Sequence, residues 1–292
     1  MTRSFDPSLM SRRTFLHTTS AAAAGAMLFS STACASAQMP LAGRIKKAIV
    51  YNMFQSDAPV VEKFRALKEA GFQGVEAQTK APEDPAEMVA AARETGVEIH
   101  SLMHGSVDNI PSAVDRAKAL GVNVILIVAG RVNEQKSYQD NYTETQAVIR
   151  EALPYAAANE VTLLVENVWN NFLLSPLEMA HYIDEFESPW IQSYFDVGNV
   201  VRFAWPEHWI PVLGSRIKRV HVKEYSRDKQ MNEGLWKGFD VEMGEGSIDW
   251  ELVRKELLAI DYTGWVTAEV GGGDIERMKE ISRQMDSILA LC

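Results

Sequence analysis

Residues 162–224 contain three short apolar runs that share one pattern: TLLVEN at 162–167, SYFDVGN at 193–199 and KRVHVKE at 218–224. Each run is rich in aliphatic, β-branched or aromatic residues and carries acidic, amide or histidine side chains towards its end. Longer amphipathic stretches separate the runs, as in proteins whose parallel strands are joined by helices. The three runs therefore predict consecutive β-strands that are buried on both faces.

The same alternation continues from Ile45 to the C-terminus. Several helix-like stretches end in Gly or Asn just before the next apolar run, as at Gly71 and Gly121, where a left-handed residue commonly closes a helix. Eight such units predict a closed (β/α)8 TIM barrel of the α/β class. The eight expected strands are residues 48–54, 74–78, 98–103, 124–128, 162–166, 193–196, 218–223 and 265–270.

The main alternative to a barrel is an open, doubly wound α/β sheet. Such a sheet usually carries a Gly-rich phosphate loop after its first strand, but Tyr51-Asn52-Met53-Phe54 stands at that place here. No low-complexity linker or charge block divides the chain further on. We therefore expect residues 38–292 to form a single TIM-barrel catalytic domain.

Residues 1–37 are predicted to be a signal peptide rather than part of the fold. The segment SRRTFL at 11–16 has the form of a twin-arginine export motif, a weakly apolar run follows at 18–29, and ASA at 35–37 offers a small-residue cleavage site. The alternative is an amphipathic first helix with a chance arginine pair. We expect recognition by the twin-arginine (Tat) export machinery and a periplasmic location.

The two cysteines bear on this expectation. Cys34 lies inside the leader and Cys292 is the last residue, so the mature chain has no intramolecular disulfide available. Lipid anchoring at Cys34 is an alternative, but Ser31 stands where a large aliphatic residue is expected before a lipidated cysteine. Cleavage without lipidation is therefore the favoured expectation.

The charge balance excludes one class of partner. Removing the three Arg and one Asp of the leader leaves 26 basic and 38 acidic residues in the mature chain. This acidic excess argues against binding to nucleic acid. Beyond the leader no apolar run reaches the ~18 residues of a membrane span, so we expect no transmembrane segment.

Four adjacent expected strands end in side chains that bind metals. In a TIM barrel the active site lies at the C-terminal ends of the strands, and these ends carry Glu166, Asp196, His221 and Glu269. Each residue alone is readily explained as structural. Together, three carboxylates would repel one another in an apolar barrel mouth unless a cation neutralised them. The mixed oxygen and nitrogen set predicts one divalent metal ion: Mn²⁺, Mg²⁺, Co²⁺ or Zn²⁺.

These stretches carry a family resemblance. The chain resembles the sugar isomerase and epimerase superfamily with a xylose-isomerase-like TIM barrel, which includes ketose 3-epimerases, hydroxypyruvate isomerases and the endonuclease IV branch. The resemblance implies that the Glu, Asp, His and Glu bind one divalent metal and that Glu166 and Glu269 are also the catalytic acid/base pair. The matching stretches are Glu166-Asn167, Asp196-Val-Gly-Asn199, His221-Val-Lys-Glu224, Gly244-Glu-Gly-Ser-Ile-Asp249 and Glu269.

The resemblance also suggests substrate contacts. Asn199 stands where many relatives have His, which leaves the substrate subclass open, and Lys223 lies in the motif that contains His221. Arg227, six residues after His221, is similar to a substrate-contacting Arg of the ketose epimerases. The alternative for Arg227 is a solvated loop arginine.

Further substrate contacts are expected from position alone. Glu76 ends the second expected strand, His104 follows the third and is favoured over His100, and Trp169 follows Glu166. A structural carboxylate and a packed aromatic are the alternatives for Glu76 and Trp169. Residues 225–246 form a long connection that we interpret as a lid over the metal, with a disordered surface excursion as the alternative.

The predicted chemistry is proton abstraction beside a sugar carbonyl through an enediolate intermediate, which isomerises or epimerises a small sugar. An exported enzyme should act on an unphosphorylated sugar, because sugar phosphates are kept in the cytoplasm. A 3-keto-glycoside lyase or hydrolase would share the first step and is the main alternative. An endonuclease IV-like phosphodiesterase fits less well with six His in all, and a non-catalytic sugar-binding barrel would not need both Glu166 and Glu269. A homo-oligomer is compatible with the sequence.

Overall fold

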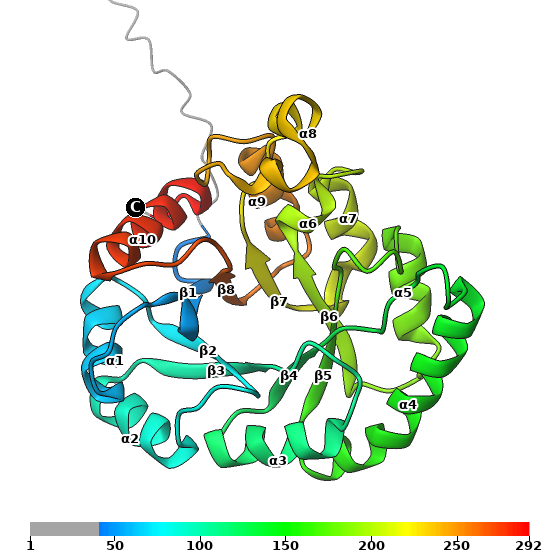
Figure 1. Ribbon diagram of the computed structural model, residues 1–292, viewed down its shortest axis with the longest axis horizontal. Helices are drawn as coiled ribbons and strands as arrows, with labels where there is room; N and C mark the ends of the chain where they lie inside the picture. Colours follow the sequence, from blue (N-terminus) through cyan, green and yellow to red (C-terminus); the bar gives the residue numbers. More distant parts are fainter. Residues whose placement is uncertain (1–40, 292) are drawn as a thin grey trace, which may run out of the picture. The chain divides into compact units, whose positions relative to one another are not determined.

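In the computed structural model, which describes residues 41–291, eight parallel strands close into a barrel in sequence order, and helices form a ring outside it (Figure 1). The predicted fold class is therefore confirmed. The predicted signal peptide, residues 1–37, and Cys34 lie outside the described residues. The strands are β1 (Ile45–Val50), β2 (Gly74–Gln78), β3 (Glu98–Met103), β4 (Val124–Ile127), β5 (Thr162–Glu166), β6 (Ile191–Asp196), β7 (Ile217–Val222) and β8 (Gly264–Ala268).

Three of the predicted strands, β2, β3 and β5, have the predicted bounds, and β1 differs most from its prediction. It begins at Ile45 rather than at residue 48, and it ends at Val50, where a 3₁₀ turn covers Tyr51–Met53. The prediction missed the start of β1 because residues 46 and 47 are lysines. The ammonium of Lys46 lies 4.9 Å from the centre of the Trp265 ring, and Lys47 is buried against α10 (Ile275–Leu289), where it donates to Ser282. Long cationic side chains can thus occupy a strand when their stems pack and their charged ends find partners.

The helices cover the outside of the barrel with their apolar faces turned inward. In α1 the buried residues are Val60, Phe64 and Leu67, three and four apart as the sequence predicts. None of the described helices is both long enough and apolar enough to cross a membrane. The helices before β5 are α1 (Val60–Glu69), α2 (Pro85–Thr95), α3 (Ile110–Leu120) and α4 (Tyr138–Ala158), and those after it are α5 (Pro176–Asp184), α6 (Val197–Val200), α7 (Pro206–Leu213), α8 (Arg227–Glu233), α9 (Trp250–Ala259) and α10.

The interior of the barrel is divided between apolar and polar side chains. Val124, Leu126, Leu164 and Tyr194 pack together as a small cluster inside it. Polar side chains from β2, β3, β7 and β8 are also fully buried: Glu76, Ser101, His221 and Thr267. Tyr194 contacts two of them, His221 and Thr267. Because buried polar groups need partners, this polar group is where specific chemistry is expected.

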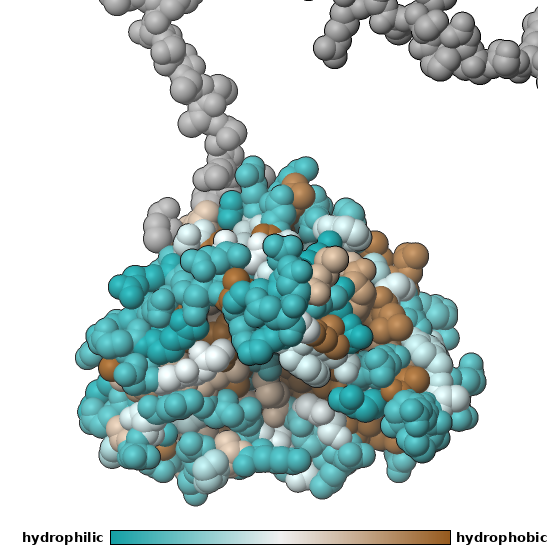
Figure 2. All heavy atoms as spheres, turned by 45° about the horizontal axis from the view of Figure 1, so that its top comes forward, coloured by the Kyte–Doolittle hydropathy of each residue, from teal (hydrophilic) through white to brown (hydrophobic). Residues whose placement is uncertain are grey.

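The outer surface is mainly hydrophilic on the face that Figure 2 presents, and hydrophobic residues interrupt it mostly at one side. Large exposed hydrophobic side chains occur in the segments that follow β5, β6 and β7: Leu174, Leu177, Phe203, Trp205, Met231 and Trp236. Such side chains are compatible with association between copies of the chain, and the homo-oligomer stays a prediction.

Candidate metal centre and active site

The four predicted metal ligands converge at one rim of the barrel. Glu166, Asp196, His221 and Glu269 each offer one ligand atom, and these four atoms all lie within 4.8 Å of one another. They come from the ends of β5 and β6, from β7 and from the residue after β8. Asp196 and His221 are fully buried, Glu166 is nearly so, and the Glu269 side chain is 27% exposed. The group is therefore deep, and Glu269 is its most open member.

Asp196 gives a direct test of whether a cation fits. Its Oδ1 accepts a hydrogen bond of 2.7 Å from the backbone N–H of Asn199 and so caps α6. Its Oδ2 is buried, lies 3.9 Å from His221 Nδ1 and accepts no well-aligned hydrogen bond from residues 41–291, but the ammonium of Lys223 lies 2.9 Å from it. A buried carboxylate oxygen is costly unless a positive charge lies against it, and in this structure the Lys223 ammonium supplies that charge. The donor set of three carboxylates and one imidazole is consistent with a divalent metal site.

His221 uses its two ring nitrogens differently. Nδ1 lies 3.0 Å from Glu166, 3.7 Å from Glu269 and 3.9 Å from Asp196, so this nitrogen faces the cluster. Nε2 lies 2.7 Å from the carboxylate of Glu76. A metal-binding imidazole usually donates its second N–H to a carboxylate, which fixes the ring and the tautomer. Nδ1 is therefore the nitrogen that could bind a metal, and Nε2–H is the donor to Glu76.

Glu76 lies in a different place from the one expected of a substrate contact. Its side chain is fully buried, one oxygen binds His221, and the other accepts a short hydrogen bond from Ser101. A bulge in the pairing of β2 with β3, between Val75 and Glu76, aligns it with Ser101. Glu76 is a positioning residue for His221 in this geometry.

Burial and mutual charge shift the titration of these groups. Burial raises the pKa of Glu166 to about 7, although the neighbouring His221 opposes the rise. Burial also raises the pKa of Asp196, against the attraction of Lys223. Burial alone would lower the pKa of His221, but Glu76 and Glu166 outweigh it and raise that pKa well above its usual value. Such strongly shifted groups in one place are characteristic of functional sites.

Lys223, predicted to contact substrate, lies within the carboxylate cluster. Its ammonium is 2.9 Å from Oδ2 of Asp196 and forms a second ion pair with Glu269. The stem of Lys223 passes over Gly198, where an added Cβ would overlap the Lys223 side chain. Burial would lower the pKa of Lys223, but Asp196 and Glu269 raise it above its ordinary value. Among the described residues, Lys223 thus supplies the positive charge that the carboxylates require.

Asn199 and Trp169 connect the ends of β5 and β6. The amide of Asn199 donates to the backbone carbonyl of Asn167 at 3.0 Å, and the backbone carbonyl of Asn199 accepts a 2.9 Å bond from the indole of Trp169. Asn167 in turn pairs with the backbone of Asp196 in both directions at 2.8 Å. These bonds hold the Asp196 backbone, so both residues act on the geometry of the cluster.

The structure does not bring Arg227 or His104 into the metal cluster. The guanidinium of Arg227 donates to the backbone carbonyls of Val201 and Ala204 and lies 4.3 Å from the centre of the Trp205 ring. The two ring nitrogens of His104 lie 3.2 Å from Thr79 Oγ1 and 2.6 Å from the Asp108 carbonyl. Both side chains fasten loops of the same rim to one another.

The predicted lid, residues 225–246, is a folded segment that contains α8 and the 3₁₀ helix Leu235–Phe239. Trp169 packs beneath it, with its ring centre 4.8 Å from those of Trp236 and Phe239 and 5.5 Å from that of Tyr225. Aromatic packing therefore holds the lid against the end of β5. The alternative of a disordered excursion does not hold for this segment.

Glu224 is a functional candidate to which sequence reasoning assigned no role. Its carboxylate is buried and accepts hydrogen bonds from the backbone of Tyr225, Gly244 and Ile248 and from the indole of Trp250. Both ends of the lid are thus tied to one side chain. Its sequence signal was its place in the motif that begins at His221, but the partners lie up to 26 residues away.

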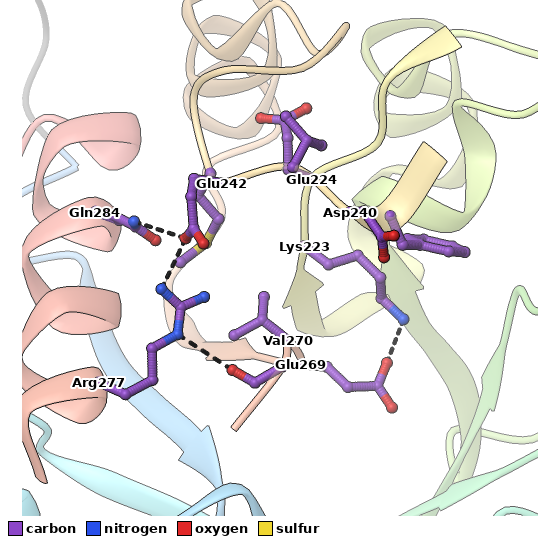
Figure 3. A pocket seen from close by; sticks show the side chains of 12 residues that line it. Lys223, Glu224, Asp240, Glu242, Glu269, Val270, Arg277 and Gln284 are labelled. Atoms are coloured by element: carbon purple, nitrogen blue, oxygen red, sulfur yellow. Dashed lines mark hydrogen bonds and ion pairs between the residues drawn. The ribbon is translucent and has the colours of Figure 1, made fainter. Parts of the chain in front are cut away.

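A cavity of about 410 Å³ opens beside the cluster. Figure 3 shows the Lys223–Glu269 ion pair at one side and Glu242, Arg277 and Gln284 at the other. The lid forms one wall, and the loop after β8 with α10 forms the opposite wall. Of the four residues in the cluster, Glu269 is the one that lines this cavity.

Comparison with known proteins agrees with this geometry. The sequence pattern of the family described as "Xylose isomerase-like TIM barrel" matches residues 64–291. The L-ribulose-5-phosphate 3-epimerase UlaE from Salmonella paratyphi A is 24% identical over 285 residues, which cover 84% of this chain and 96% of that protein. A putative L-ribulose-5-phosphate 3-epimerase, SgbU, from Escherichia coli is 30% identical over 202 residues, which cover 61% of this chain and 68% of that protein.

Solved structures share the same barrel. The 3-keto-D-glucoside 4-epimerase YcjR from E. coli aligns with a TM-score of 0.69 at 17% identity, over 85% of this chain and 99% of that protein. An L-ribulose 3-epimerase aligns with a TM-score of 0.69 at 15% identity, over 84% of this chain and 95% of that protein. At these identities the likeness establishes the fold alone.

Proposed function

Because the chain belongs to the family of xylose isomerase-like TIM barrels, we propose that it is a divalent-metal-dependent epimerase or isomerase of a small, unphosphorylated sugar. One observation carries this proposal: the ligand atoms of Glu166, Asp196, His221 and Glu269 lie within 4.8 Å of one another. The metal is one ion of Mn²⁺, Mg²⁺, Co²⁺ or Zn²⁺. Ketose 3-epimerases among the relatives support the same reaction class.

The reaction begins with removal of a proton from the carbon beside the sugar carbonyl. A divalent ion at this site supplies electrostatic stabilisation of the negative charge that then develops on oxygen. Glu269 lines the cavity, whereas Glu166 does not line it and is more deeply buried. We assign proton removal and return to these two carboxylates, since epimerisation needs a group on each face of the carbon.

The charge around the cavity supports an unphosphorylated substrate. Its lining includes four acidic residues and two basic ones, Lys223 and Arg277. Arg277 is already paired with Glu242 and Glu280, and Lys223 is paired with Glu269 in the metal-free protein. A phosphate dianion would therefore meet more carboxylates than basic side chains among the residues that line this cavity. The printed names of the two relatives above, in contrast, refer to a phosphorylated pentose.

A product assay tests the proposal. Protein loaded separately with each of the four metals is incubated with unphosphorylated ketoses and 3-keto-sugars, and the products are identified by NMR. We expect a new epimer or isomer that is absent after chelation. The proposal fails if no unphosphorylated sugar turns over with any metal, or if kcat/KM is at least tenfold higher for the phosphorylated form of the same sugar.

A 3-keto-glycoside lyase remains the second candidate, because the cavity beyond Glu269 has room for a leaving group. It shares the proton abstraction and differs in expelling the group bound to the anomeric carbon. Release of the free aglycone in the same NMR assay identifies this reaction.

The cellular location is also a proposal. Export of the folded enzyme through the twin-arginine route would place it in the periplasm, where unphosphorylated sugars are available. The residues that carry this part of the proposal are Arg12 and Arg13. Changing both to Lys should retain the protein in the cytoplasmic fraction.

A further inference from the structure

The cavity beside Glu269 extends well beyond the metal ligands. It is bounded by the lid residues Phe239 to Met243 on one side and by Val270, Gly271 and α10 on the other. Of the four ligands only Glu269 lines it. Its volume of about 410 Å³ lies in the range of pockets that bind drug-sized ligands, which begins at about 300 Å³. One sugar ring at Glu269 would leave part of this space unused.

The walls of this side pocket are of two kinds. Phe239, Val241, Met243 and Val270 make it apolar next to the ion pair of Lys223 with Glu269. Figure 3 shows Val270 between that ion pair and the polar groups on α10. Sugar rings present apolar C–H faces and polar edges, so a wall of this composition suits a second ring better than it suits an extended polar chain.

The far end of the side pocket is polar and places one guanidinium against two carboxylates. Glu242 accepts hydrogen bonds of 2.8 Å from both Arg277 and Gln284, and Arg277 also pairs with Glu280 at 3.1 Å. An anionic group is therefore not expected there, since the guanidinium already faces two carboxylates. The side-chain oxygen of Gln284 is buried and accepts no hydrogen bond within the part of the chain that the structure describes. An unused acceptor at this place suits a hydroxyl donor.

We propose that the side pocket binds the second sugar unit of a neutral glycoside, whose first ring lies at Glu269. This inference rests on the proposed function and names its substrate class. A glycosidic bond blocks the anomeric carbonyl, so the carbonyl beside the abstracted proton must be a ketone elsewhere on the first ring. An enzyme that oxidises a ring hydroxyl must therefore act on the glycoside before this one does.

The test compares substrates that contain one sugar ring with substrates that contain two, using the metal-loaded enzyme. The probes are 3-keto-glucose and 3-keto-maltose for turnover, and glucose and maltose for direct binding by calorimetry. We expect kcat/KM to be at least tenfold higher for the two-ring substrate, mainly through a lower KM. Val241→Trp fills the side pocket and Gln284→Leu removes its free acceptor, and each should bring the ratio of the two kcat/KM values towards one.

Val148→Trp is the matched control, because Val148 is exposed on α4 and does not line the side pocket. It should keep the wild-type ratio. Equal kcat/KM for 3-keto-glucose and 3-keto-maltose in the wild type overturns the proposal. The proposal is also overturned if Val241→Trp and Gln284→Leu both fold and both keep the wild-type ratio of the two kcat/KM values. If neither keto-sugar turns over although a ketose does, the side-pocket proposal is overturned and the proposed function stands. If no unphosphorylated sugar turns over with any metal but maltose binds the wild type and not Val241→Trp, the proposed function fails and the side-pocket assignment stands. If no sugar turns over and maltose does not bind, both fail.

Discussion

The ammonium of Lys223 lies 2.9 Å from the buried Oδ2 of Asp196, inside the group of side chains that is suited to a divalent ion. A lysine and a metal ion cannot occupy the same position between these carboxylates. The metal-free protein is thus stabilised by a cation of its own, and metal binding requires the ammonium to move.

Replacing Lys223 by Met should therefore have opposite effects on the metal-free and the metal-bound site. Without the ammonium, the metal-free protein should lose about 3 kcal/mol of unfolding free energy, as when one partner of a buried ion pair is removed. Metal affinity should rise, because no lysine has to be displaced. Thermal unfolding with and without chelator, together with calorimetric titration of Mn²⁺, measures both effects. Lys237→Met, at an exposed ion pair with Asp240, is the control. An unchanged Kd for Mn²⁺ would contradict this competition.

Glu76 provides a test that distinguishes positioning from substrate contact. Glu76→Ala removes the acceptor of the His221 Nε2–H bond, so metal affinity should fall by about 10- to 100-fold. Glu76→Gln keeps an acceptor, so its metal affinity should fall less. If Glu76 contacts substrate, as its strand-end position suggested, KM should change in Glu76→Gln while the Kd of the metal stays the same.

The pH dependence of metal binding follows from Glu166. Its pKa is raised from 4.5 to about 7 in the metal-free protein, so below pH 7 a proton must leave before the carboxylate binds metal. Affinity should rise about tenfold or more per pH unit below pH 7, since the raised pKa of His221 acts in the same direction. Calorimetry in buffers of different ionisation enthalpy counts the released protons.

The titration of Glu166 should also affect the stability of the metal-free protein, which should fall with rising pH whereas metal affinity rises. Because the folded-state pKa of Glu166 lies above the unfolded value, its contribution to stability is present below about pH 4.5 and is lost as pH rises to about 7. The melting temperature should fall through that window, and less so in Glu166→Gln. If the difference in melting temperature between the wild type and Glu166→Gln stays constant from pH 4.5 to 7, Glu166 titrates outside this window.

Proton transfer is tested at Glu166 and Glu269. Glu→Gln at either position keeps an oxygen ligand but removes the basic carboxylate, so kcat should fall by roughly 10²- to 10⁴-fold with metal partly retained. In D₂O the wild type should place deuterium on the carbon beside the carbonyl. Turnover without deuterium in the product would instead indicate a hydride shift between carbons.

The sequence was sufficient for the barrel and for the convergence of four side chains whose chemistry is consistent with a metal site. Strands that are apolar on both faces and helices with one apolar face have few ways to pack, and a strand end fixes which rim a residue occupies. That rule predicted the convergence of Asp196, His221 and their two partners. It could not predict the role of Glu76, whose contact with His221 joins residues 145 apart.

Loop residues were harder to place for a related reason. Arg227 and His104 follow strands, but the Arg227 side chain is directed by the carbonyl of Val201 in a neighbouring loop, and the His104 ring by Asp108 in its own loop and by Thr79 in a neighbouring one. The conformation of those loops depends on many weak contacts that no periodicity records. Lys46 and Lys47 were missed in β1 because their partners, Trp265 and Ser282, lie more than two hundred residues further along the chain.

The attachment of both lid ends to the Glu224 carboxylate affects which parts of the lid can change in sequence and length during evolution. A loop closed at its base by one side chain tolerates insertions and deletions at its tip at small entropic cost, because the closure itself is preserved. Residues 227–243 can therefore vary in length and composition while the carboxylates beneath keep their positions. We expect related enzymes to acquire new substrate ranges at this tip, and to lose their fold rather than their selectivity when Glu224 is replaced.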